Sequence, residues 1–155
     1  MEELKFQYDK YFDNATIIAT VVYEVIKKTG SGYIYLSNLL SYSKYEGDLQ
    51  ESITRRDKLI DFNADTRFNH FTEVTIKAFF DYLYQCQYIE ECTLILTNRH
   101  YTVEELYRNL AEYRNIVLKL DLIEGTLYHV KFSECINSDS LKQSITNVIG
   151  DVKIE

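Results

Sequence analysis

YFDNATIIATVVYEVIKKTGSG, residues 11–32, is a run of apolar and β-branched residues that ends in two glycines. β-Branched residues favour strands, but the apolar positions of this run recur at intervals of three and four residues, which is the period of a helix. These positions are Ala15, Ile18, Ala19, Val22, Val25 and Ile26. Asp13 or Asn14 can cap the start of a helix and Gly30 can end it. The segment therefore predicts a buried helix.

The end of this run, KKTGSG, contains the residue types of a phosphate-binding loop in the wrong order. Such a loop needs its glycines before the Lys-Ser/Thr pair, so that backbone N–H groups at a helix N-terminus face the phosphates. Here the glycines follow the carboxyl end of a helix, where carbonyl groups repel phosphate. We interpret the segment as a helix stop, with Lys27 and Lys28 suited to the negative end of the helix dipole.

The middle of the chain is typical of a winged helix, in which helices precede a β-hairpin. Residues 33–42 predict a short strand or turn that leads into an apolar helix, and residues 46–62 predict a polar helix. Residues 69–86 predict a strongly amphipathic helix. Residues 88–97 then predict two strands about a tight acidic turn, which would form the wing.

The remainder predicts a helix, a strand and a second helix. Thr102 and Glu105 have the spacing of a capping box, which begins a long helix over residues 102–120. A strand is expected at 125–132 and a short helix at 140–149. We therefore expect a mainly helical α+β fold in a single domain, 1–155, with a winged-helix-like portion at about 11–98 and a helix-strand-helix at about 101–150. The absence of proline and of Gly/Ser tracts indicates no linker.

Charge and cysteine content limit the compartment and the partners. The 155 residues include 24 acidic and 17 basic side chains, a net charge of −7, which disfavours direct binding to nucleic acid. The three cysteines lack the spacing of a disulfide framework or a zinc site, which favours a reducing compartment. No apolar run is long enough to span a membrane. We expect a cytoplasmic protein without a membrane partner.

No pattern in the sequence indicates catalysis. His70, His100 and His129 lack the i,i+4 pairing of a helical metal site, and no serine lies in a Gly-x-Ser-x-Gly motif. Cys86 and Cys92 flank a predicted strand and are expected to be small core residues. We assign no catalytic, cofactor-binding or metal-binding residue and expect that the protein is not an enzyme.

The aromatic content instead indicates a protein interface. Tyrosine suits an interface because its ring is apolar and its hydroxyl tolerates water, and the chain has 14 tyrosines. In the expected helix over 102–120, Tyr107 and Arg114 lie off the apolar stripe and could face a partner. We predict Tyr107, Arg114, Tyr42 and Tyr45 as partner-binding residues.

Three segments together resemble a known family. They are FDNATIIATVVYEVIKKTGSGYIYLSNLL, TRFNHFTEVTIKAFFDYLYQCQYIEE and RNLAEYRNIVLKLDLIEGTLYHVKF, within about residues 8–132. Their layout is similar to that of the middle components of three-component ABC ATPase systems, of which the Lamassu-type antiphage defence systems are the best known. The resemblance implies a non-catalytic adaptor that links an SMC-like ABC ATPase to an effector subunit such as a nuclease.

Two other functions are compatible with the sequence. A winged-helix transcriptional regulator of phage or plasmid origin would contact DNA through Arg55, Arg56, Lys58 and Arg67. A wing that carries Glu90 and Glu91 would, however, meet the phosphates with the wrong charge. A phage-encoded inhibitor whose acidity mimics DNA is the third alternative.

Overall fold

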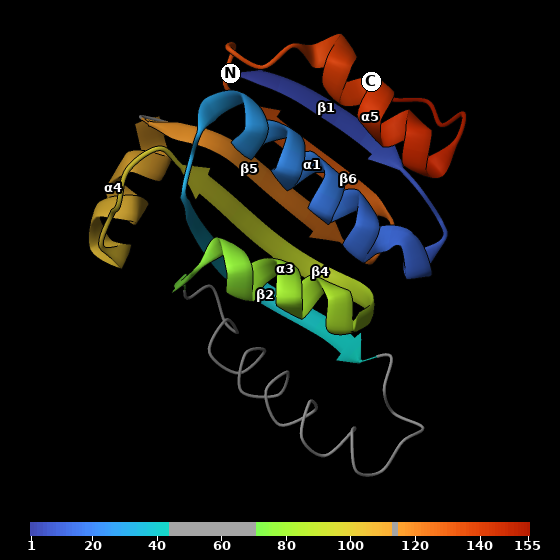
Figure 1. Ribbon diagram of the computed structural model, residues 1–155, viewed down its shortest axis with the longest axis horizontal. Coiled ribbons are helices and arrows are strands. Elements are labelled where there is room, and N and C mark those ends of the chain that lie inside the picture. Colours follow the sequence, from blue (N-terminus) through green and yellow to red (C-terminus); the bar gives the residue numbers. More distant parts are fainter. Residues whose placement is uncertain (44–70, 113–114) are drawn as a thin grey trace.

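The computed structural model describes residues 1–43, 71–112 and 115–155, and the fold within these ranges is a mixed α/β layer structure (Figure 1). Its strands are β1 (Glu2–Gln7), β2 (Tyr33–Ser43), β3 (Thr72–Val74), β4 (Cys86–Thr97), β5 (Ile116–Ile123) and β6 (Leu127–Phe132). Its helices are the short 3-10 helix η1 (Tyr11–Asp13), α1 (Asn14–Thr29), α3 (Ile76–Gln85), α4 (Val103–Glu112) and α5 (Ser138–Ile149).

The six strands form one antiparallel sheet in the order β1-β6-β5-β4-β2-β3. The strand nearest the start of the sequence pairs with the last one, since Glu2 lies opposite Phe132. Backbone hydrogen bonds in both directions between Lys5 and Glu155, of 2.8 and 2.9 Å, place the last residues along the outer edge of β1. Strands from both ends of the sequence therefore belong to one sheet.

The two faces of the sheet are covered differently. Alternate strand residues point to opposite faces, and in β4 Leu94 and Leu96 join the main core while Ile95 joins a smaller one. The main core packs α1, α3 and α5 on one face, the face seen in Figure 1. The smaller core packs Leu106 of α4 against Ile95, on the opposite face. No helix of the described ranges is both long and apolar enough to cross a membrane.

The helix predicted from residues 11–32 is confirmed as α1. Gly30 ends it in the left-handed conformation, with φ of 66°, and its N–H donates to the carbonyl of Ile26 at 2.8 Å. Lys27 and Lys28 lie in the last turn. The KKTGSG segment is therefore at the carboxyl end of a helix, as expected. The predicted strand at 125–132 and helix at 140–149 are also confirmed, as β6 and α5.

The expectation of a mainly helical, winged-helix-like domain is wrong. The residues expected to form a hairpin wing are one continuous strand, β4, and the helix expected within 33–42 is part of β2. Both strands lie inside the sheet and are covered on both faces over much of their length. The apolar run of β2 therefore lacks the alternation by which a strand is recognised. In β4 the error has another cause, because Glu90 and Glu91, expected to form the turn of the hairpin, lie within the strand. The polar helix expected at 46–62 lies outside the described residues.

The long helix expected over 102–120 is also wrong in its second half. Its capping box is confirmed: Thr102 N–H donates to Glu105 Oε2 at 2.8 Å, and Glu105 N–H donates to Thr102 Oγ1 at 3.2 Å. However, α4 ends at Glu112, and Asn115, with φ of 56°, precedes β5. Val117 and Leu120 fit a helical stripe by spacing alone, but they belong to a strand.

Two strands were missed altogether. No element is expected at β1, although Leu4, Phe6 and Tyr8 alternate with exposed residues and are buried in the main core. The helix expected over residues 69–86 is shorter, because β3 precedes it and pairs with β2. α3 begins only after Thr75, whose side chain accepts a hydrogen bond from the Ala78 N–H.

Candidate functional site

A buried asparagine joins three segments that are distant in the sequence. Asn14, the first residue of α1, is fully buried. Its side-chain nitrogen donates to the carbonyl oxygens of Ile89 in β4 and Gly125 in the β5–β6 turn, each at 2.8 Å. The Tyr128 hydroxyl donates to its side-chain oxygen. The start of α1, the first half of β4 and the β5–β6 turn are thereby held together.

The β5–β6 turn is a tight hairpin that carries a carboxylate. Glu124 and Gly125 have φ of 53° and 67°, and the Thr126 N–H donates to the Ile123 carbonyl at 3.2 Å. Positive φ at both central residues is typical of a type I′ turn, which suits the twist of a hairpin. The Gly125 N–H also donates to the Glu90 carbonyl at 2.7 Å. Glu124 is therefore held beside this part of β4.

Phe12, two residues before Asn14, is an exposed aromatic ring at the centre of this region. Its exposed fraction is 68%, and its ring meets that of Tyr88 edge to face, with 6.4 Å between the centroids. It lines two adjacent hollows, which we describe in turn. The hydrogen bonds of Asn14 fix the start of α1, two residues after Phe12. Phe12 is therefore positioned between the two hollows.

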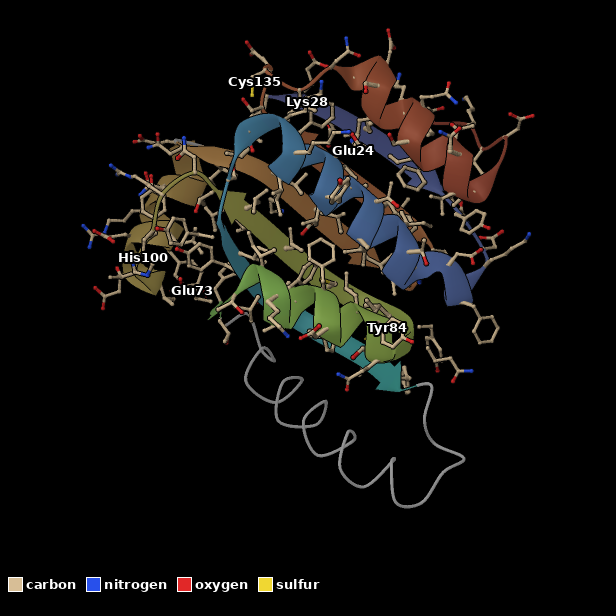
Figure 2. The ribbon with its side chains drawn as sticks, viewed as in Figure 1. Glu24, Lys28, Glu73, Tyr84, His100 and Cys135 are labelled. Atoms are coloured by element: carbon tan, nitrogen blue, oxygen red, sulfur yellow. The ribbon has the colours of Figure 1, made fainter. Side chains whose placement is uncertain are left out.

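The first hollow, the aromatic groove, lies between α1 and α3 and has a volume of about 450 Å³. Its lining residues are Phe12, Ala15, Thr16, Ala19, Phe80, Leu83, Tyr84, Cys86 and Gln87. The small side chains of Ala15 and Ala19, one helical turn apart, leave room beside α1. Tyr84, with an exposed fraction of 69%, is at the end of α3 nearest the start of α1 (Figure 2). The groove is thus apolar, with an exposed ring on each side.

The second hollow, the acidic pocket, has a volume of about 410 Å³ and is lined by Phe12, Tyr88, Glu90 and Glu124. Tyr42 supports it from β2: its ring stacks on that of Tyr88, with centroids 4.4 Å apart, and its hydroxyl donates to Glu90 Oε2 at 3.1 Å. The hydrogen bond to Glu90 and, to a smaller extent, burial raise the pKa of Tyr42 above 10.0. The phenol therefore keeps its proton and remains a donor to Glu90 at neutral pH.

The predicted partner-binding residues separate onto different parts of the protein. Tyr42 lies beside the acidic pocket. Tyr107 is on α4, on the other face of the sheet, where it is 44% exposed and meets Phe71 edge to face at 5.5 Å. The remaining predicted residues lie outside the described ranges: Tyr45, Arg114, Arg55, Arg56, Lys58 and Arg67. The structure thus does not unite Tyr42 and Tyr107 in one surface.

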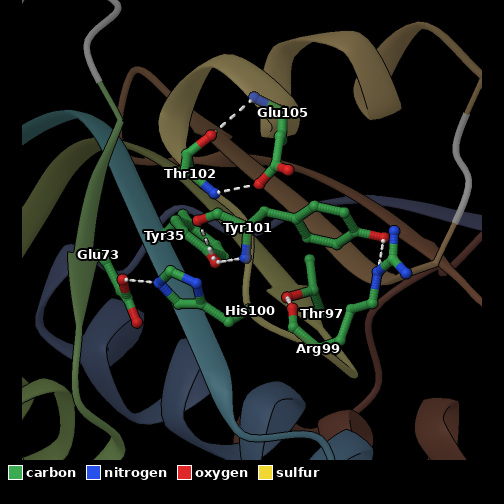
Figure 3. Close-up of polar contacts among 8 residues, drawn as sticks. All are labelled: Tyr35, Glu73, Thr97, Arg99, His100, Tyr101, Thr102 and Glu105. Carbon is green, nitrogen blue, oxygen red and sulfur yellow. Dashed lines mark hydrogen bonds and ion pairs between the residues drawn. The ribbon is translucent and has the colours of Figure 1, made fainter.

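A polar cluster anchors α4 to the sheet (Figure 3). The Tyr35 hydroxyl donates to the Tyr101 carbonyl at 2.9 Å and accepts from the Tyr101 N–H at 2.7 Å, both within the buried interior. Arg99 Nε donates to the Tyr101 hydroxyl at 2.8 Å. Nearby, His100 Nε2 lies 2.8 Å from Glu73 Oε2 in an exposed pair that ties this loop to β3. These contacts position the loop before α4 and its first residues.

The described residues contain no group of three or more His, Cys, Asp or Glu side chains placed to hold a metal ion. Comparison with family models, with curated proteins and with solved structures gives no match to this chain.

The sequence reasoning missed Phe12, Tyr84 and Glu124. Tyr84 lies within the helix expected over residues 69–86, and Phe12 precedes the expected cap at Asp13 or Asn14, but neither position indicates that the ring is exposed. Gly125 is a usable signal, because a glycine between two alternating segments favours a tight hairpin turn. Its proximity to Glu90 depends on the pairing of β4 with β5, which a local pattern does not reveal.

Proposed function

We propose that this protein is a non-catalytic, cytoplasmic adaptor subunit that binds a protein partner through the aromatic groove. The observation that supports this proposal is the pair of rings, Phe12 and Tyr84, that remain more than two-thirds exposed on either side of an apolar groove. Exposed aromatic rings that gather at one apolar hollow are typical of protein interfaces, where a partner removes them from water.

The class of partner follows from the family resemblance of the sequence. The middle components of three-component defence systems bridge an SMC-like ABC ATPase and an effector. We propose the same two partners here, with the ATPase at the groove. The transcriptional-regulator alternative assumed a winged-helix fold, and the antiparallel sheet of the described residues differs from that fold.

The proposal predicts that an ABC ATPase is encoded beside this gene, and co-purification with that ATPase tests it. Thr16→Arg would fill the groove from the exposed side of α1, and Tyr84→Ala would remove one of its rings. Removing an aromatic residue at the centre of an interface costs about 2 kcal/mol or more, which is about a 30-fold loss of affinity. We expect each variant to lose the ATPase while its thermal melting temperature stays close to that of the unmodified protein.

Tyr107→Ala is the matched control, because it removes an exposed tyrosine from the opposite face of the sheet. It should retain the ATPase. Loss of the ATPase with Tyr107→Ala but not with the groove variants would move the interface to α4. If the unmodified chain retains no ATPase, the adaptor function itself is wrong.

A further inference from the structure

The acidic pocket combines two kinds of group that both attract cations. Glu90 and Glu124 supply carboxylates, and Phe12 and Tyr88 supply aromatic rings. The face of an aromatic ring is electron-rich and attracts an ammonium or guanidinium group. The described lining residues include no Lys, Arg or His that would neutralise the carboxylates from within. The pocket is therefore complementary to a positively charged group brought from outside.

Two features give the pocket a fixed shape. The Tyr42 hydroxyl donates a hydrogen bond to one oxygen of Glu90, and the Tyr42 ring stacks on that of Tyr88. The hydrogen bonds of Asn14 hold together the chain segments that carry Phe12, Glu90 and Glu124. A site whose groups are already positioned loses less conformational freedom on binding.

Guanidinium matches these groups better than ammonium does. It is planar, so it can stack on a ring while its edge donates hydrogen bonds to carboxylates, and it is less strongly hydrated than the ammonium of lysine. The pocket also shares Phe12 with the aromatic groove. A partner segment in the groove can thus place one side chain in the pocket without a second binding surface.

We propose that the acidic pocket binds an arginine side chain of the protein partner, next to an apolar stretch of that partner in the groove. This inference rests on the proposed function, because it identifies the chemistry of the segment that the groove accepts. It predicts a partner sequence in which an arginine flanks apolar residues.

A small probe tests the pocket without the partner. N-acetyl-arginine-N-methylamide is titrated into the isolated full chain, and the aromatic NMR signals of Phe12 and Tyr88 are followed. The neutral citrulline derivative of the same shape serves as the comparison. We expect saturable shifts with the arginine derivative and at least about fivefold weaker binding of the citrulline derivative, because only the first carries a charge.

Variants locate the binding to the two carboxylates. Glu90→Gln combined with Glu124→Gln should weaken the arginine derivative at least about fivefold. Glu104→Gln combined with Glu134→Gln removes the same charge from exposed positions elsewhere and should leave binding unchanged. Phe12→Leu keeps an apolar side chain but removes the ring, and should weaken binding as well. Equal binding of the citrulline derivative, or unchanged binding by the Glu90/Glu124 variant, would overturn the proposal.

Equal binding of the corresponding lysine derivative would overturn the assignment to arginine. Measurements on the complex separate this inference from the function on which it rests. In the purified complex, the Glu90/Glu124 variant should release the ATPase at lower NaCl concentration than the unmodified chain. A complex that forms normally with this variant contradicts the arginine pocket but not the adaptor, whereas the absence of any complex with the unmodified chain contradicts the adaptor.

Discussion

The side-chain nitrogen of Asn14 lies 2.8 Å from the carbonyl oxygen of Ile89, a residue 75 positions further along the chain. The contact is buried, and the same nitrogen reaches Gly125, 111 positions away. A single polar side chain thus connects the first helix to two parts of the sheet. Buried polar groups are costly unless they are all paired, so the stability of the fold depends on this residue.

Asn14→Ala should destabilise the protein by about 3 kcal/mol, because it leaves two buried carbonyls and the Tyr128 hydroxyl without the partner they have in the native structure. Urea unfolding at neutral pH measures the change. Asn109→Ala is the matched control, since the Asn109 side chain donates to the Glu105 carbonyl on the exposed surface of α4. The control should cost less than about 0.5 kcal/mol. Equal effects of the two substitutions would contradict the role of Asn14.

Tyr128→Phe should cost about 1 to 2 kcal/mol, because it removes only the donor to the Asn14 side-chain oxygen and keeps the buried ring. The ring also stacks on Phe6, with centroids 4.6 Å apart, and this contact should survive. In the Asn14→Ala background the same substitution should cost clearly less, which a double-mutant cycle of urea unfolding measures. Additive costs would show that the two side chains are not coupled.

Alkaline pH should destabilise the fold. Burial raises the pKa of Tyr128 and of Tyr82 above the ordinary value of 10.0, so the folded protein keeps protons that the unfolded chain releases. Their contribution to stability is complete below pH 10 and is lost as the pH rises above it. The free energy of unfolding should therefore fall progressively as the pH rises above about 10.

Tyrosine absorbance provides a second measurement of this effect. In the native protein fewer than all 14 tyrosines should ionise near pH 10, with the remainder ionising on unfolding. Tyr128→Phe should make the loss of stability with pH less steep. A slope that does not change in this variant would contradict the assignment to Tyr128.

Thiol reactivity should distinguish the three cysteines. Cys135 is exposed, whereas Cys86 and Cys92 are buried, and burial raises the pKa of the Cys92 thiol well above its usual range. Because the thiolate is the reactive form, a disulfide reagent should modify one thiol per native chain and three after denaturation. Cys135→Ser should abolish the native reaction. Rapid modification of Cys92 would mean that the core opens readily, whereas modification of Cys86 would mean that the reagent enters the aromatic groove, which Cys86 lines.

The sequence was informative where structure depends on neighbours along the chain. Gly30 ends α1 and the Thr102–Glu105 pair begins α4 because both act on backbone groups within four residues. The helix expected within β2 is wrong because this strand is covered on two faces, so its apolar run has no alternation. The hairpin expected within β4 is wrong because Glu90 and Glu91 lie inside one continuous strand and not in a turn. Likewise, the spacing of Val117 from its apolar neighbours is compatible with a helix, although Val117 lies in a strand. Only the pairing of β5 with β4 and β6, which involves distant residues, distinguishes the strand from the helix.

The candidate site was less predictable, because exposure is a property of the whole fold. Phe12 and Phe79 both lie in amphipathic segments, yet their exposed fractions are 68% and 1%. Tyr42 was among the tyrosines expected at a partner surface, and it lies beside the acidic pocket, where its role stays a prediction. Glu90 was read as part of a wing, and its proximity to Glu124 arises from contacts between separate strands.

The pairing of β1 with β6 has a consequence for how the protein is made. β1 leaves the ribosome long before β6, the strand that pairs with it. Until then, Leu4 and Phe6 have no neighbouring strand, although both are buried in the finished sheet. Long-range pairing of this kind is slow and leaves apolar strands open to association with other chains. During synthesis, β1 must therefore be kept from associating with other chains until β6 has been made.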